Sequence, residues 1–446
     1  MLNVWTHGKH IGQLGQDRST GFFSFTYASG WLADTERFAL SPFLPLSAVP
    51  ADTPVRHSEV VQRYFQNLLP EAQALEDAAG LYGVAKSDLL GMLSVLGRET
   101  AGALEILPAS ARPETMRGEP RLVLREEMSN RIGARDTQPF SIWDNKIRLS
   151  LAGCQDKVAV LAWENNWFLV EGHRWASTFI VKPDSCNVAM AGITTNEFFC
   201  MRLSETLRLP TAKVSLTHLP APALVVERFD RVPYHSESEI SIRRLACIDG
   251  CQALDLAVDC RYERPVANAT HAWHGGASLQ GFFALLGDKR WVAAPGVAQL
   301  AFLRWVIFQV LIGNTDAHAK NVSFFSDAQG LRLTPSYDQV CGLVYAGIDP
   351  HLAMAIGDNF DPMTISAYNW AQLAFDNKLS PRLVAKELTA LAKGCMRELP
   401  ALQQSLLAEG AEPTMLARVA EIVEQQCAIA QRNAPLITEV DTTFLA

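Results

Sequence analysis

The stretch Gly313-Asn314-Thr315-Asp316-Ala317-His318-Ala319-Lys320-Asn321, followed by Tyr337-Asp338, decides the fold. Asn321 comes five residues after Asp316, and Asp338 comes soon after a short apolar strand. A carboxylate, then an asparagine, then a second carboxylate is the catalytic order of protein-kinase-like phosphotransferases. The match is not literal, because no His-Arg precedes Asp316 and no Phe-Gly follows Asp338. The segment therefore needs support from the rest of the chain.

Three side chains in this segment carry the predicted chemistry. Asp316 is expected to act as the catalytic base, which orients and deprotonates the attacking hydroxyl. Asn321 and Asp338 are expected to hold Mg²⁺, which prefers oxygen ligands and keeps some of its waters. There are structural alternatives: Asp316 follows the turn-forming residues Gly313-Asn314-Thr315, and Asp338 stands where a strand ends. The three side chains together favour the catalytic interpretation.

Four further side chains are candidates for a nucleotide site. Lys182 ends an apolar strand, from which a lysine can reach the α- and β-phosphates of ATP. Glu197 is the expected ion-pair partner of Lys182, but Thr194-Thr195-Asn196-Glu197 also has the pattern of a helix capping box. Glu197 cannot hold both roles at once. His318 is either a nucleotide contact or a buried structural histidine, and Lys320 either meets the transferring phosphate or is solvated.

A loop of small residues stands where a kinase keeps its glycine-rich loop. The chain contains neither G-x-G-x-x-G nor G-x-x-x-x-G-K-[ST]. In their place is Leu149-Ser150-Leu151-Ala152-Gly153-Cys154-Gln155-Asp156-Lys157, between two expected strands. Small residues let backbone N–H groups approach phosphate closely, so we expect this loop to cover the phosphates of a nucleotide.

The composition is that of an ordinary globular protein. The chain has 446 residues, 48% of them hydrophobic and 19% charged, which predicts two or three domains. A net charge of −8 argues against an extended nucleic-acid surface but leaves room for a local basic patch. The nine cysteines form no C-x-x-C pair, and the cluster Cys247, Cys251 and Cys260 lacks a second pair of zinc ligands. Free thiols in a reducing cytoplasm are expected, with no signal peptide and no membrane span.

The order of elements predicts a two-lobed fold with an extra unit in front. The class is α+β: a protein-kinase-like fold with a strand-rich small lobe, an all-helical large lobe and an added N-terminal α/β subdomain. The expected divisions are an N-terminal subdomain over 1–115, a linker with a connecting helix over 116–145, a small lobe with the nucleotide loop over 146–232, and a helical large lobe with the catalytic loop over 233–446.

Apolar periodicity predicts the individual elements. The expected strands are 2–5, 11–14, 22–27, 158–162, 167–170, 178–182, 212–216, 223–227 and a pair within 322–334. The expected helices are 57–69, 86–96, 194–207, a buried helix over 300–312, and two long amphipathic helices over 381–398 and 413–431.

Several motifs in order resemble one known family. Phe65-Gln66-Asn67-Leu68-Leu69-Pro70-Glu71 and Leu96-Gly97-Arg98-Glu99-Thr100-Ala101-Gly102-Ala103 are similar to its N-terminal subdomain. The loop 150–157, the hinge-like Val226-Glu227-Arg228-Phe229-Asp230-Arg231, and the segments 312–321 and 337–338 are similar to its kinase parts. The family is HipA, the serine/threonine-kinase toxins of bacterial toxin–antitoxin pairs. The resemblance runs nearly end to end.

The resemblance implies a set of site residues and two cofactors, ATP and Mg²⁺. Asp316 would be the catalytic base, Asn321 and Asp338 would hold the metal, and Ser150 would be an inactivating autophosphorylation site. The nucleotide would be bound by Ala152, Gly153, Cys154, Gln155, Asp156, Lys157, Lys182, Glu227, Arg228, Phe229, His318, Lys320, Asn321, Tyr337 and Asp338. The backbone at Glu227 and Phe229 would hold the adenine. Cys154, where relatives often have a small residue, is a departure from the family pattern, from which a change in the packing of the loop is expected.

The resemblance also implies partners. A HipB-like helix-turn-helix antitoxin would bind the chain and make most contacts with operator DNA. The protein substrate would be a translation component, with an aminoacyl-tRNA synthetase as the leading candidate. Two other interpretations stay open: a kinase-fold corepressor that works by binding the antitoxin, and a small-molecule kinase. Retention of Lys182, Asp316, Asn321 and Asp338 argues against the corepressor, and the N-terminal subdomain disfavours the small-molecule kinase.

Overall fold

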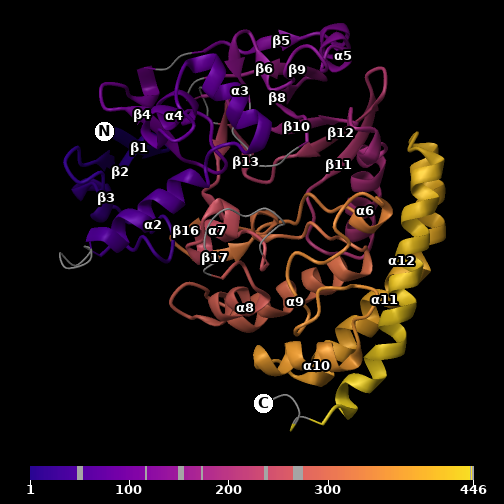
Figure 1. Ribbon diagram of the computed structural model, residues 1–446. Helices are drawn as coiled ribbons and strands as arrows, with labels where there is room; N and C mark the ends of the chain where they lie inside the picture. The colour runs from indigo at the N-terminus through magenta and orange to yellow at the C-terminus, as the bar shows by residue number, and fades with distance from the viewer. Residues whose placement is uncertain are drawn as a thin grey trace.

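The computed structural model describes residues 1–47, 54–115, 118–148, 155–171, 174–235, 240–264, 275–441 and 443. Figure 1 shows two lobes with an N-terminal subdomain beside them, as the predicted fold class requires. Ser150, Ala152, Gly153 and Cys154 lie outside the described residues. In the described part of the chain, every helix is too short or too polar to cross a lipid bilayer.

The N-terminal subdomain is a four-stranded antiparallel sheet covered by helices. Its strands lie in the order β3-β2-β1-β4 and its helices are short. Phe23 and Phe25 of β3 are buried while Ser24 between them is exposed, so one face of the strand packs on α2. The elements are β1 (Leu2–Thr6), β2 (Lys9–Gln16), β3 (Phe23–Tyr27), α1 (Ser29–Leu32), α2 (Pro54–Gln66), α3 (Ala72–Tyr82), α4 (Leu89–Leu96) and β4 (Glu105–Pro108).

The small lobe is a six-stranded antiparallel sheet in the order β11-β12-β10-β8-β9-β5. The elements are β5 (Arg121–Val123), α5 (Arg125–Gly133), β6 (Ile142–Trp143), β7 (Lys146–Ile147), β8 (Val158–Trp163), β9 (Asn166–Leu169), β10 (Phe179–Pro183), α6 (Ile193–Thr206), β11 (Val214–His218) and β12 (Pro222–Glu227). Helix α6 packs against β11 and β12, and most of its first three turns is buried. The buried residues include the polar Thr194, Thr195, Asn196 and Glu197 beside the apolar Phe198 and Phe199, so polar side chains of α6 are held inside the molecule.

The predicted linker over 116–145 needs correction. It does contain a helix, α5, but β5 pairs with β9 in the sheet, with Leu122 opposite Phe168. Met128 and Ile132 of α5 also belong to the core of the small lobe. The segment is therefore part of the small lobe, and a three-residue edge strand directly after Pro120 is too short to give a periodic signal.

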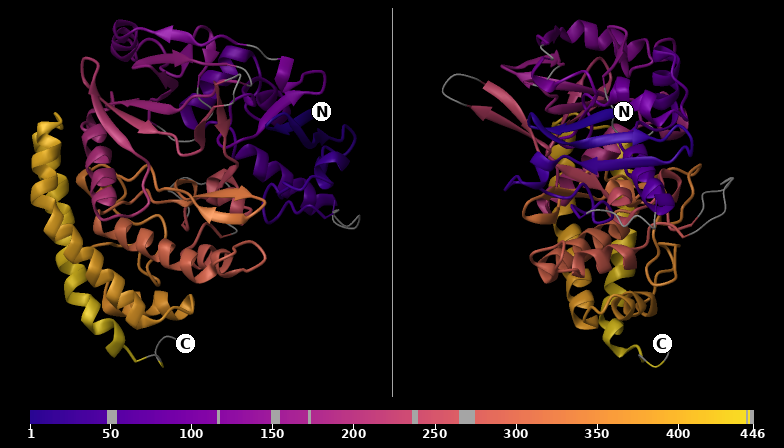
Figure 2. Two further views of the ribbon diagram at one scale, coloured as in Figure 1. Left: turned by 180° about the vertical axis from the view of Figure 1, so that it is seen from behind. Right: turned by 90° about the vertical axis from the view of Figure 1, so that its left-hand side faces the viewer.

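The large lobe is mainly helical and carries a small sheet near the cleft. The elements are β13 (Arg231–His235), β14 (Ile240–Arg244), β15 (Cys247–Asp249), α7 (Gly250–Leu254), α8 (Leu279–Gly287), α9 (Pro295–Leu311), β16 (Ser323–Asp327), β17 (Gly330–Leu333), α10 (Ala367–Asp376), α11 (Pro381–Ala408) and α12 (Pro413–Asn433). Strands β15, β16 and β17 form one sheet, and the predicted boundary at 232–233 falls inside β13. The β13–β14 hairpin projects from the body of the molecule (Figure 2).

Helix α11 runs ten residues beyond its predicted end. Pro400 lies inside it, and an interior proline removes one backbone hydrogen bond. Leu399, Leu402 and Leu406 are buried on both sides of that position, so packing against the core holds the helix together across the proline. Helices α11 and α12 lie side by side along the edge of the large lobe (Figures 1 and 2).

Within the described residues, the buried apolar side chains form two large clusters and a small one made of Leu161, Val170, Ala176 and Ile242. One cluster contains Val4, Phe25 and Phe65 of the N-terminal subdomain together with Phe302 and Trp370 of the large lobe. Most of the small lobe has a separate core, which includes Val123, Phe140, Trp143, Val158 and Val181. The N-terminal subdomain and the large lobe are therefore continuous in their interiors.

Candidate active site

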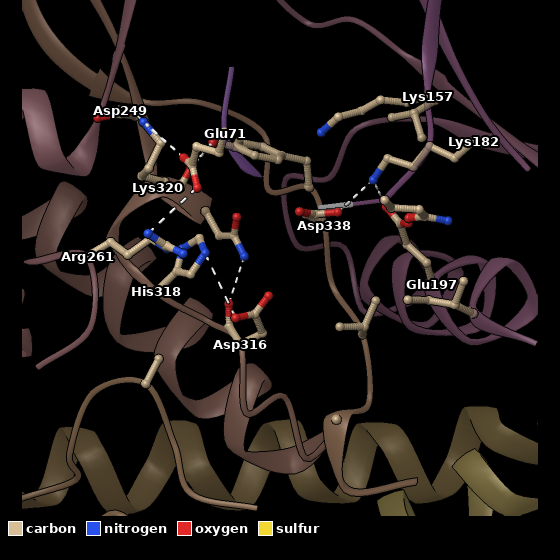
Figure 3. A pocket seen from close by; sticks show the side chains of 18 of the residues that line it. Glu71, Lys157, Lys182, Glu197, Asp249, Arg261, Asp316, His318, Lys320 and Asp338 are labelled. Carbon is tan, nitrogen blue, oxygen red and sulfur yellow. Dashed lines mark hydrogen bonds and ion pairs between the residues drawn. The ribbon is translucent and has the colours of Figure 1, made fainter. Parts of the chain in front are cut away.

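A cleft of about 840 Å³ lies between the lobes. Every predicted site residue within the described part of the chain lines it: Gln155, Asp156, Lys157, Lys182, Glu227, Arg228, Phe229, Asp316, His318, Lys320, Asn321, Tyr337 and Asp338. Figure 3 shows that the charged side chains form two groups, one around Lys182 and Asp338 and one around Asp316, His318 and Lys320.

Lys182 lies between two carboxylates. Its Nζ donates to Glu197 Oε1 at 2.8 Å and to Asp338 Oδ1 at 2.6 Å. Of the two roles open to Glu197, the structure therefore contains the ion pair with Lys182. The competing capping box is absent, because Asp184 caps this end of α6: its carboxylate accepts from the amides of Gly192 and Thr194.

The charges of this group depend on one another. Burial opposes ionisation of Asp338, but the ammonium groups of Lys182 and Lys157 outweigh it and lower the pKa of Asp338 to about 2. Burial raises the pKa of Glu197 to about 7 against the opposing pull of Lys182. Burial opposes the charge of Lys182 as well, yet Asp338 and Glu197 raise its pKa. Lys182 is therefore a fixed cation that orients two carboxyl groups, of which Asp338 is the more strongly ionised.

Lys157 brings a second cation to the same end of the cleft. Burial and the nearby charge of Lys182 lower the pKa of Lys157 to about 8. Its neighbours in the loop are held at the sheet: Gln155 Nε2 donates to the carbonyl of Pro183 at 3.3 Å, and Asp156 lies 3.5 Å from Arg135. Lys157 and Lys182 together give the positive field that a polyphosphate requires.

The catalytic loop follows directly from the buried helix α9. Gly313 has φ +63, a left-handed conformation that ends the helix. The Asn314 side chain accepts from the Asp316 amide at 2.9 Å, and Asn321 Nδ2 donates to the Asp316 carbonyl at 2.8 Å. Asp338 also has a positive φ, +55, so an unusual backbone turn aims its carboxylate at Lys182.

The oxygen donors around this loop fit a Mg²⁺ ion. Because Asn321 uses Nδ2 as a donor to Asp316, its Oδ1 is left for a cation. Asp338 shares Oδ1 with Lys182 and retains Oδ2. Carboxylate and amide oxygens at the mouth of an open cleft match the ligand preference of Mg²⁺, which keeps water and phosphate oxygens in its remaining positions.

Asp316 is the most accessible acid of the group, with 51% of its side chain exposed. The hydroxyl of Tyr262 donates to Asp316 Oδ1, and His318 Nε2 lies 3.9 Å from the same oxygen. The rings of Tyr262 and His318 meet edge to face at 5.0 Å. Tyr262 was not among the predicted site residues, because it stands outside any recognised motif. The two alternatives for His318 both remain, since it is largely buried and still lines the cleft.

Lys320 is neither solvated nor directed at a free phosphate position. Only 2% of its side chain is exposed, and its ammonium donates to Asp249 and twice to Asn67. The solvated alternative for Lys320 is therefore wrong. Its predicted role as a nucleotide contact stays a prediction that this pairing does not favour. Asp249 was detectable in the sequence, because Asp249 and Gln252 have the spacing of a capping box and form one.

The hinge between the lobes carries Glu227, Arg228 and Phe229. The Phe229 ring packs against Phe325 at 5.9 Å and Tyr337 at 5.6 Å. The Arg228 guanidinium turns inward and pairs with Asp230 at 2.8 Å, which gives it a structural place. The adenine contacts predicted for this segment stay predictions.

The N-terminal subdomain clamps this hinge. Asp230 accepts from Arg228 and Arg231 and from the amide of Gly102 at 2.9 Å. Arg231 in turn donates to the carbonyls of Thr100 and Gly102. Burial opposes ionisation of Asp230, but the two guanidinium groups outweigh it and hold the pKa of that carboxyl well below its usual range. The fold, the cleft and these charges together define a protein-kinase-like phosphotransferase.

Comparisons with known proteins identify the family. Residues 149–400 match the family model of the HipA-like C-terminal domain, and residues 2–107 match that of the HipA N-terminal domain. The chain belongs to the HipA family of serine/threonine protein kinases.

Individual relatives are similar along most of their length. The chain is 34% identical over 387 residues to the serine/threonine-protein kinase toxin HipA of Shewanella oneidensis, which covers 86% of this chain and 84% of that protein. It is 32% identical over 397 residues to the putative kinase Y4mE of Sinorhizobium fredii, with 88% and 89% covered. A solved structure of Shewanella oneidensis MR-1 HipA with HipB and its operator DNA matches with a TM-score of 0.83 and 31% identity, covering 99% of this chain and 100% of that one.

Proposed function

We propose that this chain is an ATP- and Mg²⁺-dependent protein kinase that acts as the toxin of a toxin–antitoxin pair. The observation that carries the proposal is Lys182, whose ammonium joins Glu197 and Asp338 across the cleft at 2.8 and 2.6 Å. This arrangement is the one that kinases need in order to bind ATP phosphates beside a metal. Asp316 and Asn321 line the same cleft.

The residues divide the reaction between them. Lys182 and Lys157 bind the phosphates of ATP, and Asn321 and Asp338 hold Mg²⁺, which supplies charge neutralisation at the transferring phosphoryl group. Asp316 orients the serine or threonine hydroxyl of the substrate and accepts its proton as the new P–O bond forms. The bond between the β–γ bridging oxygen and the γ-phosphorus breaks, and ADP leaves with that oxygen.

The biological part of the proposal rests on family membership. The substrate is a translation component, with an aminoacyl-tRNA synthetase as the leading candidate, and its modification arrests growth. A HipB-like helix-turn-helix antitoxin restrains the kinase and contacts operator DNA, as the Shewanella structure of HipA with HipB and operator DNA suggests. Phosphorylation of Ser150 by the enzyme itself switches it off, because a charge of about −1.5 to −2 in the nucleotide loop repels ATP.

The Asp316→Asn variant tests the chemistry. It retains the size of the side chain but cannot take a proton, so it should fold, bind ATP and lose about 10²- to 10⁴-fold in phosphate transfer. Intact-mass measurement after incubation with Mg-ATP follows autophosphorylation, and peptide mapping locates it at Ser150. Autophosphorylation of the variant at the wild-type rate would remove Asp316 as the base.

Induced expression separates the proposed toxin from its alternatives. The wild type should arrest growth and the Asp316→Asn variant should not, with new phosphosites on a translation enzyme. Equal arrest by both would favour a corepressor that acts by binding alone. Phosphate transfer to small metabolites, without new protein phosphosites, would favour a small-molecule kinase.

A further inference from the structure

The buried ammonium of Lys320 joins the catalytic loop to the N-terminal subdomain. It donates to the Asn67 carbonyl at 3.1 Å, to Asn67 Oδ1 at 3.0 Å and to Asp249 Oδ2 at 2.6 Å (Figure 3 shows the bond to Asp249). An ammonium has three donors, so these three partners use all of them. Glu71 of the same subdomain lies 3.7 Å away. Two of the three bonds therefore come from outside both kinase lobes.

Asn67 is itself held firmly. Its Nδ2 donates to the carbonyl of Arg63 and to that of Leu256, both at 2.9 Å. Because Oδ1 accepts from Lys320, the whole amide is satisfied, and the residue is buried. A buried, fully bonded asparagine fixes the position of whatever it binds.

Hydrogen bonds hold the C-terminal end of helix α2 against α7, beside the catalytic loop. Arg63 makes two parallel bonds of 2.8 Å to Asp255, and Gln252 donates to the carbonyl of Tyr64 at 3.1 Å. The apolar core is also continuous across this contact, since Phe65 and Cys251 belong to one cluster. The end of helix α2, which Asn67 follows directly, is therefore fixed relative to the large lobe.

The backbone around Lys320 is connected both to Asp338, through Tyr337, and to Asp316, through Asn321. Its carbonyl accepts from the hydroxyl of Tyr337 at 2.7 Å, and Tyr337 precedes Asp338. Asn321 follows Lys320 and donates to the carbonyl of Asp316. A shift of Lys320 would therefore displace a proposed metal ligand and loosen its bond to the proposed base.

We infer that Asn67 is a positioning residue for phosphoryl transfer: through Lys320 it fixes the catalytic loop, so that the N-terminal subdomain is part of the kinase machinery. The inference rests on the proposed kinase function. The alternative is that the Asn67–Lys320 contact contributes only to stability. Displacement of reacting groups by about 1 Å can cost about 10²-fold in rate, so a positioning role predicts a measurable effect on turnover.

Three variants of the full chain separate the two roles. Asn67→Leu removes the side-chain acceptor for Lys320 and leaves the backbone carbonyl of residue 67. Asn67→Asp keeps an oxygen at the place of Oδ1 while losing the two amide donors. Asn369→Leu is the matched control, because Asn369 is also a buried asparagine that closes a capping box, on α10 of the large lobe. For each we would measure kcat, the KM for ATP, the Mg²⁺ concentration for half-maximal rate, and the midpoint of thermal unfolding.

We expect Asn67→Leu to lower kcat at least tenfold and to raise the Mg²⁺ requirement, with ATP binding in the absence of Mg²⁺ unchanged. Asn67→Asp should recover most of the lost turnover, although both Asn67 variants are less stable than the wild type. Asn369→Leu should lose stability without losing kcat per folded molecule. If kcat of Asn67→Leu, corrected for the folded fraction, equals that of the wild type, the contact is structural only.

A further variant, Lys320→Met, tests the inference if Asn67→Leu does not fold. It removes the other side of the contact, and it should show the same fall in kcat and the same rise in Mg²⁺ requirement. An unchanged Mg²⁺ requirement and an unchanged kcat in the folded fraction would overturn the inference. Failure of the wild type itself to transfer phosphate would instead overturn the proposed function.

Discussion

The hydroxyl of Tyr262 donates a hydrogen bond to Asp316, which lies 54 residues further along the chain. The side chain of Asp316 is otherwise half-exposed, so this bond limits the directions in which its carboxylate can turn. Burial and the charge of Asp316 raise the pKa of Tyr262, which therefore stays protonated and remains a donor. The hydrogen bond allows Tyr262 to orient the carboxylate of Asp316, the proposed base.

Tyr262→Phe should lower kcat about tenfold, because a hydrogen bond to a charged group is worth about 1.5–3 kcal/mol. The ring that packs on His318 is retained, so stability and the KM for ATP should change little. Initial rates at saturating Mg-ATP measure the effect. A faster variant would show instead that Tyr262 blocks the base.

Asp338→Ala should weaken ATP binding in the presence of Mg²⁺ and have a much smaller effect without it. Lys182 keeps its bond to Glu197 in this variant, so the phosphate-binding cation stays in place. Calorimetric titration with ATP, with and without Mg²⁺, measures the difference. Asp327→Ala is the control, because Asp327 is a half-exposed carboxylate paired with Arg332 at the end of β16. Identical titrations of the Asp338→Ala variant and the wild type would remove Asp338 as a metal ligand.

ATP affinity should fall as the pH rises above about 8. The pKa of Lys157 in the cleft is about 8, below its ordinary 10.5, so the free enzyme loses this charge at moderately alkaline pH. Bound polyphosphate favours the charged form and raises that pKa again, so binding takes up a proton between about pH 8 and 10.

The proton uptake can be measured by titration in two buffers of different ionisation enthalpy. Lys157→Met should bind ATP more weakly at neutral pH and show a flatter pH dependence. Lys386→Met, which changes an exposed lysine on α11 of the large lobe, should behave like the wild type. A wild-type affinity that is constant from pH 7 to 10 would contradict the assignment of Lys157.

Asp230→Asn should destabilise the protein by about 3–5 kcal/mol, since it leaves Arg228 and Arg231 buried without their counter-charge. Chemical denaturation measures the loss. Asp288→Asn breaks a pair with Arg290 that is largely exposed, so its effect should be small. Equal effects of the two variants would mean that the hinge network contributes no more than a surface ion pair.

The parts of the site that depend on short spacing could be predicted from the sequence. Asp316, Asn321 and Asp338 belong to one continuous segment, and Lys182 and Glu197 are 15 residues apart on adjacent elements. The chemistry of kinases requires these residue types in this order, so spacing alone indicates their roles. The choice between the two roles of Glu197 needed the structure, because the sequence does not show that Asp184 caps helix α6.

Contacts between distant segments could not be predicted. Lys320 meets Asn67 across 253 residues, and no local pattern distinguishes a buried, paired lysine from a solvated one. The edge strand β5 and the continuation of α11 past Pro400 are also decided by tertiary packing, which overrides local preference. The sequence shows which groups are present, whereas the fold decides which of them are already bonded.

The division of the interior into two large clusters has a consequence for synthesis of the chain. One core of the small lobe consists of residues between Val123 and Ala223, whereas helix α6 and the residues Leu224 and Val226 of β12 pack in the cluster shared with the other units. The N-terminal subdomain is made earlier, but its apolar residues share a cluster that extends to Ile437, near the end of the chain. The N-terminal subdomain is therefore synthesised first, but its apolar core is completed last. A nascent chain therefore cannot complete the packing of its N-terminal subdomain until Ile437 has been synthesised, which makes the first-made unit depend on the residues of α11 and α12.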